Sequence, residues 1–305
     1  MAKIKISAVV NTRNEAENIF DCLRALKFCD EIVVVDMESE DNTKEIAKEF
    51  TDRIYDHKKV GFVEPARNFA IQKALGDWIL IVDADERIPK TLAAKLIEIA
   101  DKNEIDFVRI PRRNLVFGEW LQHSRWWPDY NIRFFKKGAV QWQDEIHSVP
   151  VTYGNGLNLE DDAKFALEHH HYRTIDEYFL RALRYSNQQS KELIKSGYVF
   201  DPADLIKKPL GEFLSRFFAG EGYKDGLHGL VMALLQYFSM LLIYLKVWEA
   251  EGHKPIKERA LTPLWQTVFR EKFREFRYWV LTAKIQYSGS KTEAFLLKLQ
   301  RRLLK

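Results

Sequence analysis

Residues 78–89 read WILIVDADERIP, five apolar residues followed directly by two aspartates that stand one residue apart. An apolar run of this length, bounded by polar residues, predicts a buried β-strand over 78–82. Pro89 suits the first turn of a helix, so the next segment, 89–100, is predicted to be helical. The carboxylates of Asp83 and Asp85 therefore belong to the connection that follows the end of a strand.

The same order of strand and helix repeats through the first 110 residues. Apolar or β-branched runs predict further strands, and helical spacing of apolar residues predicts further helices. The strands are expected at 4–10, 31–36, 53–55 and 106–110, and the helices at 19–26, 43–50 and 66–75. This alternation favours an α/β fold with a Rossmann-like, mostly parallel sheet and right-handed crossovers. Ligands of such sheets bind beyond the carboxyl ends of the strands, where Asp36 and Asp83 each end an apolar run.

Three roles are open for the pair Asp83 and Asp85. One carboxylate could cap the helix near Pro89, although capping leaves the other unexplained. A nucleophilic aspartate with an acid two residues on is a second possibility, but the hydrolases that use it carry the pair after their first strand. The third is a divalent cation held by oxygen ligands and bridging a nucleotide diphosphate.

Two more residues at predicted strand ends or helix starts suit a nucleotide. The carboxylate of Asp36 can accept hydrogen bonds from a base or ribose. The guanidinium of Arg67 can meet a diphosphate, although a surface ion pair is the ordinary role of such a residue. The sequence contains neither G-x-G-x-x-G nor a Walker motif, so a phosphate cradle of those kinds is excluded.

Four segments together resemble family 2 glycosyltransferases, and among them the lipopolysaccharide-core β-glucosyltransferases. They read VVNTRNEAENI at 9–19, EIVVVDMESEDNT at 31–43, ARNFAIQKALGDWILIVDADE at 66–86 and WWPDYNIRFF at 126–135. The resemblance implies a GT-A fold, a nucleotide-sugar donor, a divalent metal (Mn²⁺ or Mg²⁺) and inversion of the anomeric centre. It covers about residues 4–175, which gives a catalytic domain at 1–175 and a helical C-terminal region at 176–305.

Carried over by position, the resemblance implies roles for the residues after three of the strands. Asp36 would hold the base of a UDP-sugar, Asp83 would meet ribose or sugar hydroxyls, and Asp85 would bind the metal. Met37 stands where the family commonly has a small residue. The other expected donor-binding residues are Asn11, Thr12, Arg13, Glu15 and Arg67.

Inversion in one step needs a base that takes the proton of the acceptor hydroxyl. The segment WQDEIHSVP at 142–150 offers Glu145 as the first candidate, then Asp144, and His147 third. Related sequences often have Val-His-Glu at the place where this chain has Ile-His-Ser. Exposed loop charges are the alternative interpretation of these residues.

The segment EHHHYRT at 168–174 contains three consecutive histidines. On an extended segment at most two of them can share a face. The resemblance places a family His-Tyr pair at His171 and Tyr172, so His171 is expected to complete the metal coordination beside Asp85. A run of exposed histidines without a ligand is the other interpretation.

The aromatic segment around 126–135 lies where an acceptor sugar would have to bind. Aromatic rings pack against sugar C–H groups, and an arginine can bind phosphate; packing in the core is the ordinary role of tryptophan. The predicted acceptor-binding residues are Trp127, Asp129 and Arg133.

Residues 227–245, LHGLVMALLQYFSMLLIYL, form the most apolar stretch of the chain. They just reach the length that spans a hydrocarbon core of ~30 Å, but His228, Gln236 and Ser239 disfavour a spanning helix. Residues 253–305 hold 13 Lys and Arg against 4 Asp and Glu, which favours an anionic membrane surface over a buried helix alone. We therefore predict a peripheral, monotopic protein on the cytoplasmic face of the inner membrane, as a tail this basic is rarely exported.

The predicted function is a metal-dependent inverting glycosyltransferase that acts on a lipid-linked or membrane glycan in cell-envelope polysaccharide or lipopolysaccharide biosynthesis. One alternative is a sugar-1-phosphate nucleotidylyltransferase, but such enzymes carry G-x-G-T-R where this chain has NTRNE at 11–15. The other is a basic module that binds nucleic acid or a membrane. Nucleic acid is disfavoured, because a total charge of +3 with +9 in the tail leaves residues 1–252 at −6. The two cysteines, Cys22 and Cys29, match no metal-ligand spacing and fit a reducing cytoplasm.

Overall fold

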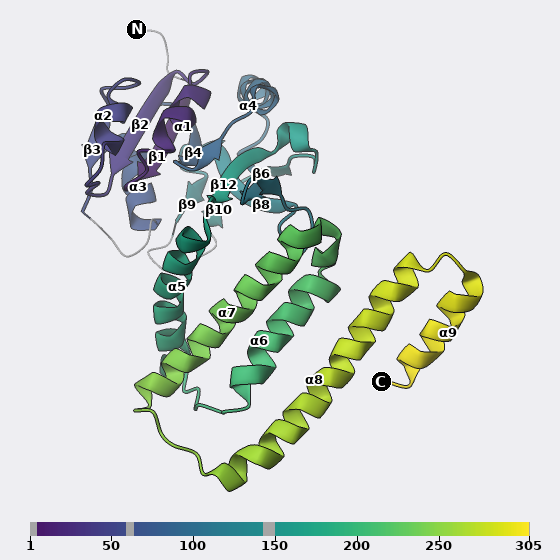
Figure 1. Ribbon diagram of the computed structural model, residues 1–305. Helices are drawn as coiled ribbons and strands as arrows, with labels where there is room; N and C mark the ends of the chain where they lie inside the picture. The colour runs from purple at the N-terminus through teal and green to yellow at the C-terminus, as the bar shows by residue number, and fades with distance from the viewer. Residues whose placement is uncertain (1–4, 59–63, 143–149, 305) are drawn as a thin grey trace. The chain divides into compact units, whose positions relative to one another are not determined.

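The computed structural model describes residues 5–58, 64–142 and 150–304 (Figure 1). The chain divides into two compact units, one of residues 1–115 with 127–171 and one of residues 116–126 with 172–305. The candidate bases Glu145 and Asp144, and His147 with them, lie outside the described residues. The domain limits at 1–175 and 176–305 stay a prediction.

The first unit is built on a sheet with the strand order β3-β2-β1-β4-β8-β6-β12-β5. Its first four strands are parallel, as predicted: β1 (Ile6–Thr12), β2 (Glu31–Asp36), β3 (Ile54–Asp56) and β4 (Trp78–Asp83). Beyond β4 the sheet changes direction, because β8 (Asp129–Lys136) is antiparallel to both β4 and β6 (Phe107–Val116). The smaller strands are β5 (Glu86–Arg87), β7 (Glu119–Trp120), β9 (Val140–Gln141), β10 (Val151–Thr152), β11 (Gly156–Asn158) and β12 (Leu167–Tyr172).

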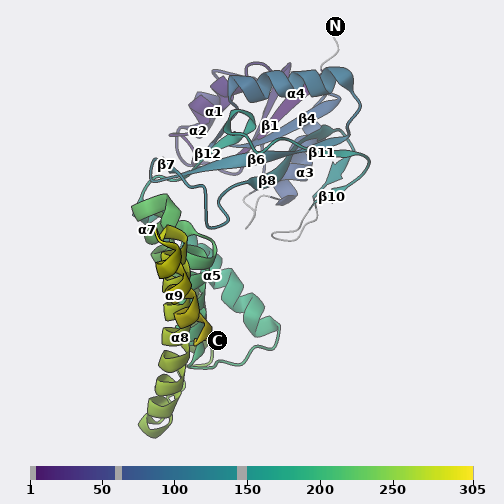
Figure 2. The same ribbon diagram turned by 90° about the vertical axis from the view of Figure 1, so that its right-hand side faces the viewer.

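Helices cover both faces of this sheet (Figure 2). Successive residues of a strand point to opposite faces, so the apolar run of β4 is divided between two cores. Leu80 and Val82 pack in a cluster with residues of α1, α2 and α4, whereas Ile79 and Ile81 pack in a second cluster with residues of α3. These helices are α1 (Ile19–Ala25), α2 (Thr43–Ala47), α3 (Glu64–Lys73) and α4 (Lys90–Lys102). The alternating pattern that predicted an α/β fold is confirmed.

The register of the parallel strands brings the predicted polar positions to one edge. Thr12 at the end of β1 pairs with Asp36 at the end of β2, and Asn11 pairs with Asp83 at the end of β4. The carboxyl ends of three neighbouring strands thus place these four residues in one row across the sheet.

The second unit is helical, which confirms the helical C-terminal region. Its helices are α5 (Ile175–Lys195), α6 (Asp204–Leu214), α7 (Gly226–Ala250), α8 (Glu258–Tyr287) and α9 (Lys291–Arg302). Helix α7 packs against α5 and α6, while α8 contacts α6 and α9 (Figure 1). The core of the unit gathers residues from both of its chain segments, among them Val116, Leu121, Tyr178, Met232 and Leu235.

The apolar stretch predicted at 227–245 forms most of helix α7. Within the described part of the chain, Gly222–Ala250 is the one helical stretch long and apolar enough to cross a membrane, judged by length and composition. Only 33% of its most apolar window is buried inside the protein. Its exposed apolar side chains fall on one side of the helix, at Leu227, Leu234, Phe238 and Leu245. Helix α7 therefore has one packed face and one exposed apolar face.

Candidate functional site

The edge formed by β1 and β2 carries buried polar groups. Asn11, Thr12 and Asp36 are 6%, 2% and 0% exposed. The side-chain amide of Asn11, the hydroxyl of Thr12 and Oδ1 of Asp36 have no hydrogen-bond partner among the described residues. Buried polar groups are nearly always hydrogen-bonded, so this edge has the character of a site completed by a polar ligand.

The loops after β1 and β2 are tied to one another above this edge. The backbone N–H of Asn14 donates to Ser39 Oγ (2.9 Å), and the N–H of Glu40 donates to Asn14 Oδ1 (2.8 Å). Ser39 N–H in turn donates to Oδ2 of Asp36 at 2.9 Å. These bonds fix the segment that carries Arg13 and Glu15 next to the Asp36 carboxylate.

Asp83 is held by two guanidinium groups. Arg67 Nη2 donates to both carboxylate oxygens, at 2.9 and 3.2 Å, and Arg133 Nη2 donates to Oδ2. Burial alone would raise the pKa of Asp83, but Arg133 and Arg67 hold that pKa well below its usual range. Asp83 is therefore a carboxylate at any physiological pH, with its orientation fixed from two sides.

Glu86 is the buried member of the acidic stretch, and its role was not predicted from the sequence. It is 0% exposed and accepts hydrogen bonds from Arg133 Nη2 (2.6 Å) and from the backbone N–H of Asp83 (2.9 Å). Arg112 Nη1 lies 3.4 Å from the same carboxylate. The only signal in the sequence was a third carboxylate directly after the Asp-x-Asp pair.

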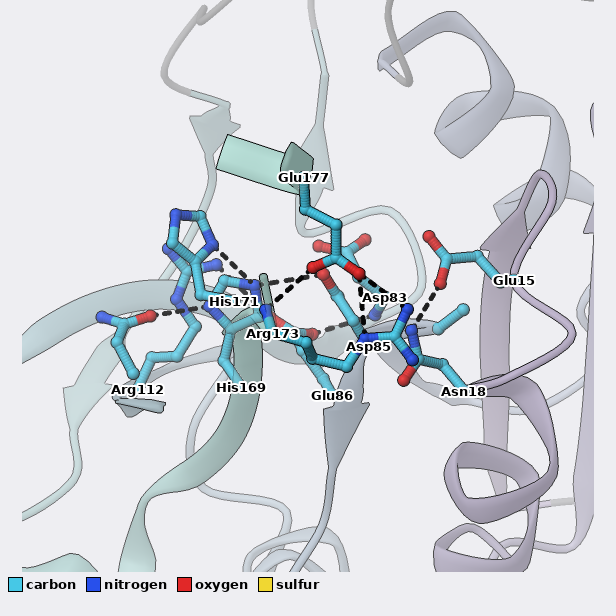
Figure 3. A network of polar contacts seen from close by, with 12 residues as sticks. Glu15, Asn18, Asp83, Asp85, Glu86, Arg112, His169, His171, Arg173 and Glu177 are labelled. Carbon is cyan, nitrogen blue, oxygen red and sulfur yellow. Dashed lines mark hydrogen bonds and ion pairs between the residues drawn. The ribbon is translucent and has the colours of Figure 1, made fainter. Parts of the chain in front are cut away.

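Asp85 lies beside two histidines of strand β12 (Figure 3). His169 Nε2 is 3.3 Å from Asp85 Oδ2, and His171 Nδ1 is 3.2 Å from His169 Nε2. Two of the three consecutive histidines share a face, as the strand geometry predicted. The imidazole next to Asp85 is nonetheless that of His169, which the sequence analysis did not single out. His171, predicted to complete the metal coordination beside Asp85, lies next to His169, and its role in metal binding stays a prediction.

This group of atoms fits a divalent cation that shares its coordination with a substrate. One carboxylate oxygen and one imidazole nitrogen 3.3 Å apart can both bind a single cation at ligand distances of about 2.1 Å. Among the described residues, no set of three His, Cys, Asp or Glu side chains is arranged as a complete metal site. Mg²⁺ commonly takes one or two protein ligands and completes its shell with water and substrate phosphates, so a diphosphate would supply the rest.

Two of the predicted acceptor-binding residues belong to the same polar cluster. Asp129 Oδ2 accepts from Arg112 Nε (2.9 Å) and Nη2 (2.6 Å), and Arg133 is 4% exposed. Burial would raise the pKa of Asp129, but Arg112 lowers it. Trp127 is half-buried. Contact of these three residues with an acceptor stays a prediction.

Comparison with known proteins gives a family match over the region that holds the site. Residues 7–156 match the family described as Glycosyl transferase family 2. The chain is 27% identical over 262 residues to the lipopolysaccharide core biosynthesis glycosyltransferase LpsC of Rhizobium meliloti, covering 83% of this chain and 95% of that protein. It is 26% identical over 259 residues to an uncharacterized glycosyltransferase of Rickettsia conorii, covering 81% and 90%.

Solved structures with a similar fold include two bacterial proteins. One is Staphylococcus aureus TarS (residues 1–349) in complex with UDP-GlcNAc, with a TM-score of 0.44 and 18% identity over 82% of this chain and 92% of that one. The other is glucosyl-3-phosphoglycerate synthase of Mycobacterium tuberculosis with Mn²⁺, UDP-glucose and phosphoglyceric acid. Its TM-score is 0.39, with 16% identity over 66% of this chain and 83% of that one.

The buried position of Glu86 leads to a stability test. Glu86→Gln keeps the shape of the side chain but removes a buried negative charge from Arg133, so we expect the free energy of unfolding to fall by about 3–5 kcal/mol. Asp85→Asn is the matched control, because the side chain of Asp85 is 15% exposed. We expect the free energy of unfolding to fall far less in this variant. Urea unfolding of both variants measures the difference, and equal losses would contradict the structural role of Glu86.

Proposed function

Because residues 7–156 match glycosyl transferase family 2, we propose that the protein transfers a sugar from a UDP-sugar to a lipid-linked or membrane glycan of the cell envelope. The family match confirms the resemblance inferred from the sequence, and the first unit has the corresponding GT-A type of α/β fold. The similarity to LpsC, a protein named for lipopolysaccharide core biosynthesis, supports a glycoconjugate acceptor of that kind.

The observation that carries the proposal is the row of unpaired buried polar atoms at the ends of β1 and β2. A nucleotide base or ribose has the donors and acceptors to satisfy Asn11, Thr12 and Oδ1 of Asp36. Asp83, fixed by Arg67 and Arg133, follows in the same row and presents its carboxylate in one orientation. We assign the nucleoside to this edge, with Arg13 and Glu15 on the loop beside it.

The diphosphate of the donor would extend from this edge to Asp85. Asp85 and His169, with His171 next to them, are the side chains that would hold Mn²⁺ or Mg²⁺. A divalent cation there neutralises the charge that develops on the leaving diphosphate. The cationic groups of Arg67 and Arg133 are committed to Asp83, so their part is to orient that carboxylate.

The proton of the acceptor hydroxyl needs a base on the far side of the sugar. Glu145 is our first candidate and Asp144 the second, as the sequence suggests; both lie outside the described residues. We propose that Trp127 contacts the acceptor. The segment from Trp127 to Arg133 links this tryptophan to the polar cluster around Asp83.

The alternative functions have less support. A nucleotidylyltransferase shares the α/β core, but the family match over residues 7–156 is to glycosyl transferases. A nucleic-acid-binding module would concentrate basic residues on the α/β part, whereas the excess of Lys and Arg lies in residues 253–305. The basic tail therefore suits an anionic partner other than nucleic acid.

We assign the tail to the anionic surface of the inner membrane, on its cytoplasmic side. Helix α8 exposes an aromatic stripe, defined by Trp265, Phe269, Phe273 and Phe276, which are 39–63% exposed. Their spacing of four, four and three residues places them on one face of the helix. Arg270 and Arg274 each follow a phenylalanine of the stripe in the sequence and fall on the adjoining, polar side of the helix. An apolar stripe with basic residues on the polar side is typical of a helix that lies in the headgroup region.

Loss of the Asp85 carboxylate should abolish metal-dependent donor binding. Asp85→Ala is expected to bind UDP-sugar no better with Mn²⁺ than without it, and to lower turnover by orders of magnitude, while the fold survives. Titration calorimetry with and without Mn²⁺ measures this. A variant that binds UDP-sugar with Mn²⁺ as the parent does would contradict the metal-binding role of Asp85.

The base assignment separates binding from chemistry. Glu145→Gln keeps the shape of the side chain but not its basicity, so donor affinity should hold while transfer falls by roughly 10²–10⁴-fold. Full transfer by this variant would exclude Glu145. Asp144→Asn would then be expected to be the inactive one.

The aromatic stripe and its arginines should contribute differently to membrane binding. Arg270→Gln with Arg274→Gln should weaken binding to phosphatidylglycerol vesicles by roughly 30-fold at low salt, at about 1 kcal/mol per basic residue. Phe269→Ser with Phe273→Ser should remove the part of the binding that persists in high salt, because salt screens only the charged part. Leu75→Ser, an exposed apolar residue of the first unit, is the control for vesicle sedimentation. Binding unaffected by either pair would contradict the assignment.

A further inference from the structure

The side chains behind His169 form a chain of polar contacts that the proposed function does not use. We propose that Asn114, oriented by Asp129, is a positioning residue that holds His169 in the tautomer whose Nε2 is a ligand atom beside Asp85. The inference rests on the proposed metal-assisted function, and it adds the reason why His169 presents a lone pair to the metal.

The first contact in the chain is an ion pair. Asp129 Oδ2 accepts two hydrogen bonds from the guanidinium of Arg112, at 2.9 and 2.6 Å. A carboxylate in such a pair is ionised and can only accept hydrogen bonds. Any amide that contacts Asp129 must therefore turn its NH₂ group towards it.

Asn114 makes that contact and is 1% exposed. Its Nδ2 donates to Asp129 Oδ2 at 3.2 Å, so its Oδ1 faces the opposite way. There Oδ1 lies 2.6 Å from Nδ1 of His169. A carbonyl oxygen has no proton to give, so Nδ1 of His169 is the donor and carries the hydrogen.

The tautomer of His169 follows from this bond. When one ring nitrogen of a neutral imidazole carries the hydrogen, the other has a lone pair, and its hydrogen-bond partner decides which is which. His169 is 4% exposed, and its Nε2 faces Asp85 Oδ2 at 3.3 Å and His171 Nδ1 at 3.2 Å. A lone pair and a carboxylate oxygen directed at one another at this distance are held together well by a cation between them.

The opposite orientation of Asn114 would have the opposite effect. With its NH₂ group towards His169, Nδ1 would have to accept, Nε2 would carry the hydrogen, and no lone pair would face the metal. The charge of Asp129 prevents this orientation, because it would set the carbonyl oxygen of Asn114 against a carboxylate. Asp129 thus acts on His169 through Asn114. No hydrogen bond joins Asp129 and His169 directly among the described contacts.

Two variants and one matched control test the inference. Asn114→Leu removes the acceptor for Nδ1, and Asp129→Asn, nearly isosteric, removes the charge that orients Asn114. Both should weaken Mn²⁺ binding, measured by electron paramagnetic resonance without nucleotide, by about 10–100-fold. Asn131→Leu is the control: Asn131 Nδ2 also donates to Asp129, at 3.3 Å to Oδ1, but no described contact joins it to His169.

The tautomer itself is read in the metal-free protein. Long-range ¹H–¹⁵N spectra above the pH at which His169 is neutral should show the hydrogen on Nδ1 in the parent and in Asn131→Leu. In Asp129→Asn the signal should shift towards the Nε2–H form, which a merely structural role of Asp129 would not produce. If Asn114→Leu fails to fold, Asp129→Asn carries the test.

The outcomes separate this inference from the proposed function. Parent protein with the hydrogen on Nε2, or variants that bind Mn²⁺ as tightly as the control, would overturn the positioning role and leave the glycosyltransferase proposal intact. A parent that binds UDP-sugar but takes up no Mn²⁺ even when UDP is present would overturn the ligand role of His169. Weakened Mn²⁺ binding together with the shifted tautomer supports the inference.

Discussion

The buried pair of Glu86 and Arg133 is the interaction on which the site depends. Glu86 is 0% and Arg133 4% exposed, and two charges removed from water are tolerated only when they satisfy one another. Arg133 comes from β8, whereas Glu86 lies in β5, the short strand after β4, so the pair joins β8 to the segment that follows β4. With the same guanidinium Arg133 reaches Asp83. The buried guanidinium of Arg133 therefore sets the geometry at the end of β4.

This pair gives the three carboxylates of the DADE sequence three different roles. Glu86 is buried and structural, and Asp83 is oriented by guanidinium groups at the row of strand ends. Asp85 lies beside His169 of β12. Ala84 and Asp85 form the turn between β4 and β5, so the carboxylates of this short acidic motif are not bound to the alternation of a single strand and can meet different partners. Asp83 and Glu86 share Arg133, whereas Asp85 contacts His169.

The sequence predicted those parts of the structure that depend on local pattern. The apolar runs before Asp36 and Asp83 predicted two parallel strands correctly, and the row at their carboxyl ends followed from fold class alone. Glu86 and His169 were missed, because their roles come from partners 47 and 84 residues away (Arg133 and Asp85) that no local periodicity reveals. Strand β8 was missed for a similar reason: four of its eight residues are polar or charged, and the one of them that is buried, Arg133, is held by Asp83 and Glu86. Long-range ion pairs, rather than propensity, fix this half of the sheet.

The division of the chain into units has a consequence for its modularity. Residues 116–126 belong to the helical unit, so the backbone passes from one unit to the other three times rather than once. Val116 and Leu121 of this excursion are buried among residues of α5 and α7. A gene fragment that stopped after residue 175 would encode this excursion without the side chains that shelter it, and would leave an apolar loop in water. The two units are thus interleaved along the sequence, and joining one complete domain to the end of another would not reproduce this order of segments.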